Sequence, residues 1–303
     1  MSKIKIGMAG WHERDGLYPR GCRSPIEKLW FYAQEFPIAE VDSTYYAIPS
    51  QEVTRRWVRH TPDGFVFNVK AFRLFTAHHT QPQALPPHVL RELSADLANR
   101  HYVHYSDVPP SLRNSLWEDF VRMLKPFGIT NKLGVVLFQF APWFRPLRES
   151  FDHILECKRQ LSNYRIAVEF RNRWWLHPDY FEHTLGFLRD NEIEYVAVDE
   201  PQGFDSSVPP LAEVIGRLGV IRFHGRNDAT WEKKGLKSST QRFDYYYSPD
   251  EMDEWVPRIK SMQERAHEVH VIMNTNNGDQ GTYNGRLLSR LLGEGLKQQS
   301  SLF

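Results

Sequence analysis

The sequence predicts an α/β fold, a single (β/α)₈ TIM barrel. Short apolar runs rich in strand-forming residues alternate with longer helical patterns from one end of the chain to the other, which is typical of parallel βα units. Eight such runs fit within 303 residues, the usual size of a closed barrel. We see no internal repeat, low-complexity tract or linker. We therefore expect residues 1–303 to form one domain.

The eight runs give the expected strands. They are Ile4–Gly10, Ile38–Asp42, Phe65–Lys70, Leu133–Phe140, Arg165–Phe170, Glu194–Asp199, Val220–His224 and Val269–Asn274. Because strands that alternate with helices pair in parallel, all eight should point the same way, with the helices outside.

Three helices carry clear start signals. Ser24-Pro25 precedes IEKLWFYAQEF, Pro49-Ser50 precedes QEVTRRWVRH, and Ser248-Pro249 precedes DEMDEWVPRIKSM. A Ser side chain accepts a hydrogen bond from an unpaired helix N–H, and a Pro in the first turn needs no donor of its own. Pro257 lies close enough to its helix start to be tolerated, but it could equally kink that helix.

Two connections are longer than a βα unit requires. They are Arg73–Ser111 after the third strand and Gly225–Tyr247 after the seventh, and both leave the same face of the barrel. Long loops in compact domains are usually lids or local insertions. We expect a helix around Val89–Arg100 in the first one.

Bulk composition limits the classes of function. The chain has 38 basic and 37 acidic side chains, so a nucleic-acid partner would need a local patch rather than a global field. Cys22 and Cys157 show no metal-ligand spacing, which indicates a reducing compartment. No apolar stretch has the length of a signal peptide or a membrane span. We expect a cytoplasmic protein with no membrane association.

Polar residues collect where the predicted strands end, the face that carries chemistry in such barrels. Alternation places Glu40 with Asp42, Asn68 with Lys70, Glu169 with Arg171, and Arg222 with His224, while Gln139, Asp199 and Asn274 end three other strands. These charges either neutralise one another in a buried network or form a ligand site. We favour the ligand site, because apolar side chains would fill a barrel at a smaller desolvation cost.

Five tryptophans follow predicted strands closely: Trp11, Trp143, Trp174, Trp175 and Trp231. Flat aromatic walls suit sugar rings or nucleobases, although such rings can also cap a barrel as apolar lids. His78 and His79 lie in the long third loop, and we expect both to face solvent.

Several ordered motifs, GMAGW…LYP, EVDSTYYAIPS, TPDGFVFNVKA, VEFRNRWW, RFHGR and MNTNN, resemble the YecE-like proteins, domain-of-unknown-function family 72. The resemblance runs from Ile4 to about Leu292 and implies a TIM barrel, often likened to the xylose-isomerase and endonuclease-IV group, without supplying an activity. The matching residues are Gly10, Trp11, Tyr18, Pro19, Glu40, Asn68, Lys70, Glu169, Arg171, Trp175, Arg222, His224 and Gly225. One departure is Met8-Ala9, where the family often has a hydroxyl or thiol.

Our first hypothesis is an enzyme, a hydrolase or an isomerase or lyase, acting on an anionic, ring-containing substrate such as a phosphorylated sugar, a nucleotide or a nucleic-acid end. Glu169 or Glu40 would be the base and His224 the acid. The remaining candidates would bind substrate, with the first three as an anion clamp: Lys70, Arg171, Arg222, Trp11, Asp42, Asn68, Trp175, Asp199, Arg226 and Asn274.

Other functions stay open. A non-catalytic module could capture a nucleotide, a nucleic acid or a protein partner on the same rim. One divalent metal ion could be held by carboxylates among Glu40, Asp42, Glu169 and Asp199. A retaining glycosidase with its carboxylates after the fourth and seventh strands is disfavoured, because Gln139 and His224 stand there, although Glu40 and Glu169 could form another pair. A multi-zinc site is disfavoured by the shortage of histidines.

Overall fold

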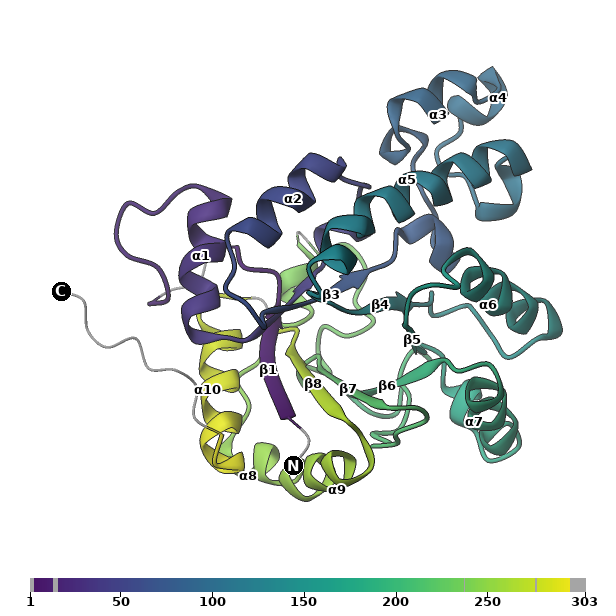
Figure 1. The fold of residues 1–303 in the computed structure, drawn as a ribbon. Coiled ribbons are helices and arrows are strands. Elements are labelled where there is room, and N and C mark those ends of the chain that lie inside the picture. The colour runs from purple at the N-terminus through teal and green to yellow at the C-terminus, as the bar shows by residue number, and fades with distance from the viewer. Residues whose placement is uncertain (1–2, 13–15, 237, 276, 295–303) are drawn as a thin grey trace.

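The computed structural model describes residues 3–12, 16–236, 238–275 and 277–294 and shows a closed barrel of eight parallel strands (Figure 1). The strands pair in chain order, and β8 closes onto β1. They are β1 (Lys3–Ala9), β2 (Ile38–Val41), β3 (Val66–Lys70), β4 (Leu133–Gln139), β5 (Ile166–Glu169), β6 (Glu194–Asp199), β7 (Leu218–Phe223) and β8 (Glu268–Met273). All eight predicted runs are confirmed, and the predicted fold is correct.

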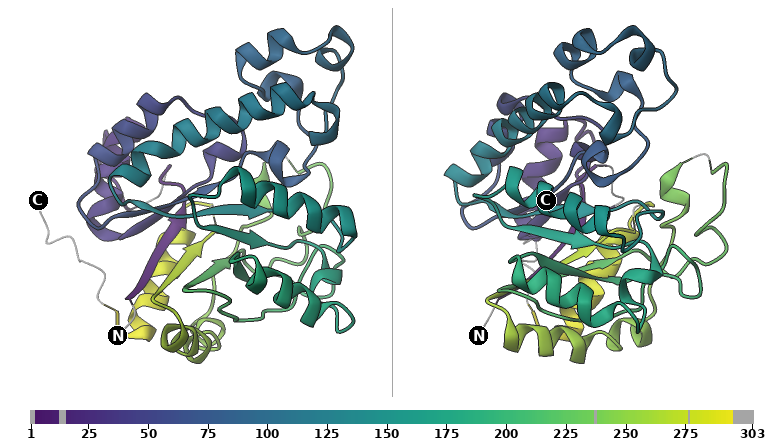
Figure 2. Two further views of the ribbon diagram at one scale, coloured as in Figure 1. Left: turned by 45° about the vertical axis from the view of Figure 1, so that its right-hand side comes forward. Right: turned by 90° about the vertical axis from the view of Figure 1, so that its right-hand side faces the viewer.

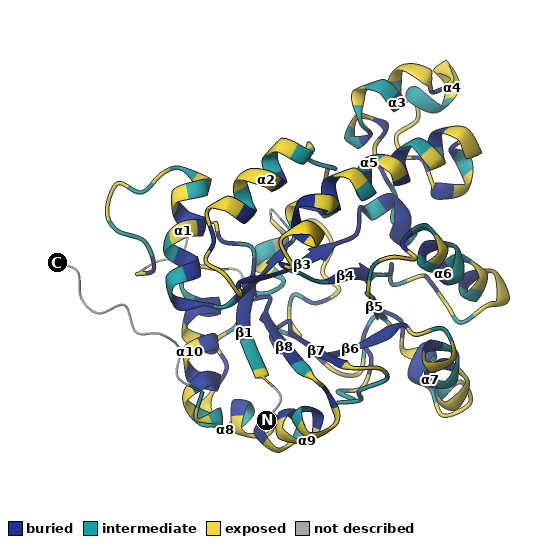
Figure 3. Ribbon diagram, viewed as in Figure 1, coloured by how far each residue is buried: buried dark blue, intermediate teal, exposed yellow. Residues whose placement is uncertain are grey.

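Helices surround the barrel. They are α1 (Pro25–Glu35), α2 (Gln51–Arg59), α3 (Pro87–Glu92), α4 (Ala95–Ala98), α5 (Pro110–Ile129), α6 (Arg148–Gln160), α7 (Phe181–Asp190), α8 (Pro249–Asp253), α9 (Val256–Arg265) and α10 (Gln280–Leu292). Figure 3 shows strands that are buried over most of their length and helices that mix buried and exposed residues. The helices therefore shield the outer face of the sheet while their other sides meet water.

The three predicted helix starts are confirmed, and the structure settles the position of Pro257. Ser248 accepts a hydrogen bond from the Glu251 N–H at 3.2 Å, and the Glu251 carboxylate accepts one from the Ser248 N–H at 2.8 Å. α8 ends at Asp253 and α9 begins at Val256, so Pro257 lies in the first turn of α9. Its missing N–H therefore breaks no helical hydrogen bond.

Both long connections are present as insertions. The one after β3 contains α3 and α4, which stand away from the barrel above α5 (Figure 2). The prediction of one helix over Val89–Arg100 is wrong in detail, because Leu93 is extended and Ser94 starts α4 by accepting a hydrogen bond from the Leu97 N–H. A bridge between Thr80 and Val103 ties the two ends of this segment together.

No helix in the part of the chain that the structure describes is both long and apolar enough to cross a membrane.

Lys132 links the C-terminal end of α2 to the barrel by hydrogen bonds. It precedes β4, is buried, and donates hydrogen bonds to the Val58 carbonyl at 2.8 Å and to the Thr61 carbonyl at 2.7 Å. The last carbonyls of a helix have no donor within the helix, so this ammonium supplies one. It therefore couples α2 to β4.

We predict that Lys132→Met lowers the free energy of unfolding by about 2 kcal/mol, because the buried carbonyls lose a charged donor. Urea denaturation of the variant beside Lys125→Met, which replaces an exposed lysine of α5, would measure this. Equal stability of the two variants would contradict the role given to Lys132.

Candidate functional site

Four charged or titratable side chains from three strands meet inside the barrel. The Arg222 guanidinium donates to Oε1 of Glu40 and to Oε2 of Glu169, each at 2.6 Å. His224 lies beyond the end of β7 and places its Nε2 at 3.0 Å from Oε1 of Glu169. All four are completely buried. We call Glu40, Glu169, Arg222 and His224 the central network.

Register explains why these residues meet. Val198 pairs with Arg222 across β6 and β7, and Gln139 pairs with Glu169 across β4 and β5. Side chains alternate along each strand, so the residues of the central network share the inward face. Arg222 and His224 share this face, as the alternation along the strand predicted, and both reach Glu169.

Two members of the central network, Glu169 and His224, have a clear protonation state. Burial alone would raise the pKa of Glu169, but Arg222 and His224 more than offset this and hold the pKa well below its usual range. Burial lowers the pKa of His224 to about 4, against the opposing pull of Glu169. At neutral pH, Glu169 is therefore charged and the His224 imidazole is neutral.

A cavity of about 300 Å³ opens above this network at the carboxyl end of the barrel, and we call it the mouth cavity. Its lining comes from the ends of β2, β3, β4, β5 and β8 and from both insertions. The residues are Asp42, Tyr45, Tyr46, Lys70, His78, Gln139, Phe140, Pro142, Trp143, Arg171, Arg242, Phe243 and Asn274. Gln139 and Asn274 hydrogen-bond to Glu169 and His224, so these two amides separate the cavity from the central network.

Three cations face the mouth cavity. Lys70 pairs with Asp42 at 2.8 Å and lies 4.6 Å from the centre of the Tyr45 ring. The Arg171 guanidinium lies over the buried Trp231 ring at 4.6 Å. The Nε atoms of Arg171 and Arg242 are buried and make no hydrogen bond among the described residues, although Nε of Arg171 lies 3.3 Å from Oε2 of Glu200. Such donors suit an anion supplied by a ligand.

Carboxylates offset little of this charge. Glu200 lies 3.3 Å from Nε of Arg171, but burial raises the pKa of Glu200 to about 8, although Arg171 lowers it. Burial and the nearby Lys70 and Arg73 lower the pKa of His78 to about 3, so His78 is neutral. At pH 7 three positive groups face the mouth cavity, with the charged Asp42 beside Lys70 and the charged Glu169 at 3.7 Å from Arg171.

Four predicted binding residues line the mouth cavity: Asp42, Lys70, Arg171 and Asn274. The predicted catalytic residues Glu169, His224 and Glu40, and the predicted clamp residue Arg222, lie below it in the central network.

Asp199 and Arg226 do not belong to this site. Val198 shares the inward face with Arg222, so Asp199 points outward. There it accepts hydrogen bonds from Trp255 at 2.7 Å and from Arg226 at 2.8 Å, and Arg226 also reaches Glu254. The expectation that Asp199 and Arg226 bind substrate at the mouth is wrong, because one residue of register turns a side chain to the other face.

Asn68 and Trp175 also lie away from the mouth. Asn68 hydrogen-bonds to the buried His270 deeper in the barrel at 3.0 Å. Gly134 leaves room for this pair, since a Cβ there would lie 2.5 Å from the Asn68 oxygen. Trp175 has no exposed surface; it stacks on Phe170 and donates to the Phe144 carbonyl, so it cannot wall a ligand site.

The other predicted aromatic residues lie in different surroundings. Trp143 is 52% exposed and lines the mouth cavity, whereas Trp231 is buried beneath Arg171. Trp11 lines a neighbouring pocket rather than the mouth cavity itself. The expectation that His78 faces solvent is wrong, because it is largely buried in the cavity wall with its Nδ1 at 2.9 Å from the Thr76 hydroxyl.

Sequence reasoning missed Glu200 and Arg242. Glu200 was within reach of the alternation rule, because it follows Val198 by two residues and so shares its inward face. Arg242 lies in the insertion Gly225–Tyr247, which has no strand periodicity from which to predict a direction.

The carboxylates considered for a divalent ion do not converge. Glu40 and Glu169 face opposite ends of the Arg222 guanidinium, Asp42 binds Lys70, and Asp199 points outward. Among the residues that the structure places, no three His, Cys, Asp or Glu side chains group together to hold a metal ion. The bridging Arg222 also argues against a glycosidase pair made of Glu40 and Glu169.

We predict that stability depends on pH through Glu200. Its pKa of about 8 exceeds the ordinary value of 4.5, so the folded state holds this proton to higher pH than the unfolded chain does. This stability is fully present below pH 4.5 and is lost as pH rises through 8. Glu200→Gln should therefore gain stability over the natural chain, by a few kcal/mol between pH 5 and pH 9. Urea denaturation across that range measures it, and a difference independent of pH would show that Glu200 is charged throughout.

The family model described as "Protein of unknown function DUF72" matches residues 5–302. The UPF0759 protein YunF of Bacillus subtilis is 32% identical over 292 residues, which cover 95% of this chain and 94% of YunF. The UPF0759 protein YecE of Escherichia coli K12 is 25% identical over 254 residues, or 76% of this chain and 77% of YecE.

Two solved structures resemble this chain over nearly its whole length. A DUF72 family protein from Enterococcus faecalis is 26% identical and superposes with a TM-score of 0.79 over 96% of each chain. One from Thermotoga maritima is 25% identical, with a TM-score of 0.75 over 96% of this chain and 100% of its own. The resemblance predicted from the strand-end motifs is thus confirmed, and the chain belongs to the DUF72 family.

Proposed function

We propose that this protein binds a small anionic, ring-containing molecule in the mouth cavity and acts on it by acid–base chemistry. The observation that carries the proposal is the convergence of Lys70, Arg171 and Arg242 on one cavity of about 300 Å³ at the carboxyl end of a TIM barrel. This is the end where barrel enzymes bind their substrates. A phosphorylated sugar or a nucleotide fits the class.

The donors suit a phosphate or carboxylate group in particular. Arginine presents several N–H groups in a fixed plane and binds such oxygens in pairs, while lysine adds a point charge. Glu200 keeps its proton near neutral pH, so Arg171 is opposed by Glu169 at 3.7 Å and not by Glu200 as well. Asp42 orients Lys70 and leaves two guanidinium groups for the ligand.

His224 is the group we propose for proton transfer. Glu169 accepts a hydrogen bond from its Nε2, which leaves the Nδ1 lone pair directed at the Asn274 amide, at 2.9 Å. Asn274 lines the cavity, so a ligand that displaces this amide would reach the imidazole. Glu169 then acts as the carboxylate that fixes the tautomer, as in other acid–base pairs, and not as the base.

Binding without catalysis is the second candidate, and one observation favours it. Glu40, Glu169, Arg222 and His224 are completely buried and bonded to one another, as expected of a network that neutralises its own charges. In that case the Lys70 and arginine groups alone would carry the function.

The proposed place of action is the cytoplasm. Cys22 and Cys157 are not joined by a disulfide, which agrees with a reducing compartment.

We predict that Arg242→Gln weakens the binding of inorganic phosphate by about tenfold, because it removes a charged donor. Isothermal titration calorimetry measures the dissociation constant. Arg122→Gln, on the exposed side of α5, is the matched control and should bind as the natural chain does. If the two variants bind phosphate equally well, the anion does not lie in the mouth cavity.

We predict that His224→Gln lowers turnover at least 100-fold, the usual contribution of a proton-transferring group, and changes ligand affinity less than twofold. The assay incubates the natural chain with sugar phosphates and nucleoside monophosphates that bind, and follows them by mass spectrometry. Glu169 is a poor choice for this test, since its removal would leave Arg222 with one carboxylate and destabilise the barrel. Binding without any conversion would support the second candidate instead.

A further inference from the structure

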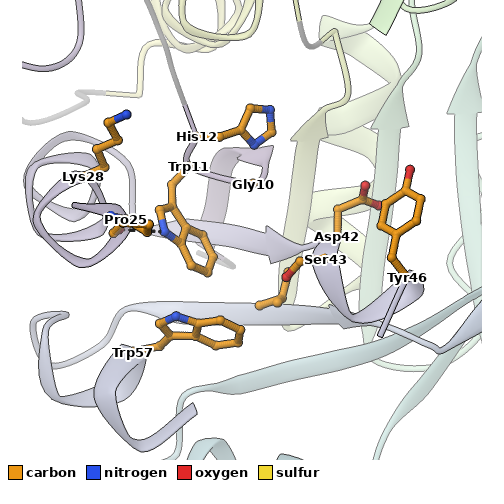
Figure 4. Close-up of a pocket in the computed structure, with 10 residues that line it drawn as sticks. Gly10, Trp11, His12, Pro25, Lys28, Asp42, Ser43, Tyr46 and Trp57 are labelled. Carbon is orange, nitrogen blue, oxygen red and sulfur yellow. Dashed lines mark hydrogen bonds between the residues drawn. The ribbon is translucent and has the colours of Figure 1, made fainter. Parts of the chain in front are cut away.

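A second pocket of about 400 Å³ lies beside the mouth cavity, and we call it the side pocket. It lies where the loop after β1 and the turn after β2 face α1 and α2. In Figure 4, the indoles of Trp11 and Trp57 lie on one side and Asp42, Ser43 and Tyr46 on the other. It therefore belongs to the same end of the barrel as the mouth cavity.

The two cavities are neighbours, because Asp42 and Tyr46 line both of them. Asp42 is the residue that holds Lys70 in the mouth cavity, and Tyr46 is 51% exposed between the two. A ligand anchored at Lys70 is therefore bordered on that side by the residues that open the side pocket.

The side pocket is more aromatic than the mouth cavity, although Lys28 also lines it. Its two tryptophans meet edge to face, with ring centres 5.3 Å apart. The chain holds Trp11 in place at both ends, since its Nε1 donates to the Pro25 carbonyl at 3.1 Å and its own carbonyl accepts from Tyr18 at 2.7 Å. Trp57 is packed against Phe127. An aromatic wall that is fixed in advance binds a flat ring without first losing side-chain freedom.

We infer that the side pocket is the ring subsite of the ligand whose anionic group lies against Lys70, Arg171 and Arg242. This inference rests on the proposed function for the anion. It narrows the substrate class to a phosphate or carboxylate that carries a planar ring, such as an aryl phosphate or a nucleoside monophosphate, and it excludes compact phosphates such as a phosphorylated triose. The Asp42 carboxylate supplies a polar partner for the edge of the ring.

Size agrees with this assignment. Pockets for small ligands usually measure about 300 to 1,000 Å³. Each cavity alone lies at the low end of that range, and the two together reach its middle. One site made of a cationic half and an aromatic half suits a molecule with the same division.

The test compares four probes by calorimetry at pH 7: inorganic phosphate, 4-nitrophenyl phosphate, adenosine 5′-monophosphate and adenosine. In the natural chain, at least one ring-bearing phosphate should bind about tenfold or more tightly than inorganic phosphate, a gain of about 1.4 kcal/mol. Ser43→Phe places a ring in the side pocket and should remove this gain while changing phosphate affinity less than twofold. Ser43→Ala, the matched control at the same exposed position, should keep it.

Equal binding of phosphate and both ring-bearing phosphates in the natural chain would overturn the inference and leave the proposed anion site standing. So would a gain that survives in Ser43→Phe. Failure of phosphate and of both ring-bearing phosphates to bind would instead count against the proposed function. In that event, adenosine binding that is lost in Ser43→Phe would still support a ring subsite, and no adenosine binding would overturn it too. Trp57→Leu, which removes a ring but keeps an apolar side chain, provides a second variant should Ser43→Phe not fold.

Discussion

The Arg222 guanidinium lies between the carboxylates of Glu40 and Glu169 in the middle of the barrel, out of contact with water. A lone charge there would cost many kcal/mol, so the three groups are stable only together. Their strands, β2, β5 and β7, are spread around the barrel. The network therefore fixes the relative positions of strands that are not neighbours, and every group above it inherits that alignment.

The positive charge of the mouth cavity follows from this arrangement. Glu40 and Glu169 are committed to Arg222, and Glu169 also takes hydrogen bonds from Gln139 and His224. Glu169 also lies 3.7 Å from the Arg171 guanidinium, but among the described residues neither acid forms an ion pair with Lys70 or Arg242. Glu200 could neutralise Arg171, but its burial raises its pKa to about 8. The cavity thus stays cationic although the chain as a whole is nearly neutral, at +1.

Periodicity and helix start signals were enough to predict the eight strands, because each strand carries its own apolar pattern. They also placed Lys70 and Arg171 correctly at the mouth. They failed at Asp199, where the inward residue is its neighbour Glu200, since composition alone does not give the register. They failed again at Trp175, because nothing local shows that Phe144 and Phe170 cover it. Arg242 was out of reach for a different reason: its position depends on how a long irregular segment folds back over the barrel.

The residues that line the mouth cavity come from two parts of the fold. Its floor, Gln139 and Asn274, belongs to strand ends tied to the buried charges, whereas His78, Arg242 and Phe243 come from the two insertions. Changes in the insertions can alter which molecule is accepted without disturbing the barrel that supports them. Evolution can therefore diversify ligand choice across relatives of this fold while the scaffold stays constant, and two members with the same floor need not share a ligand.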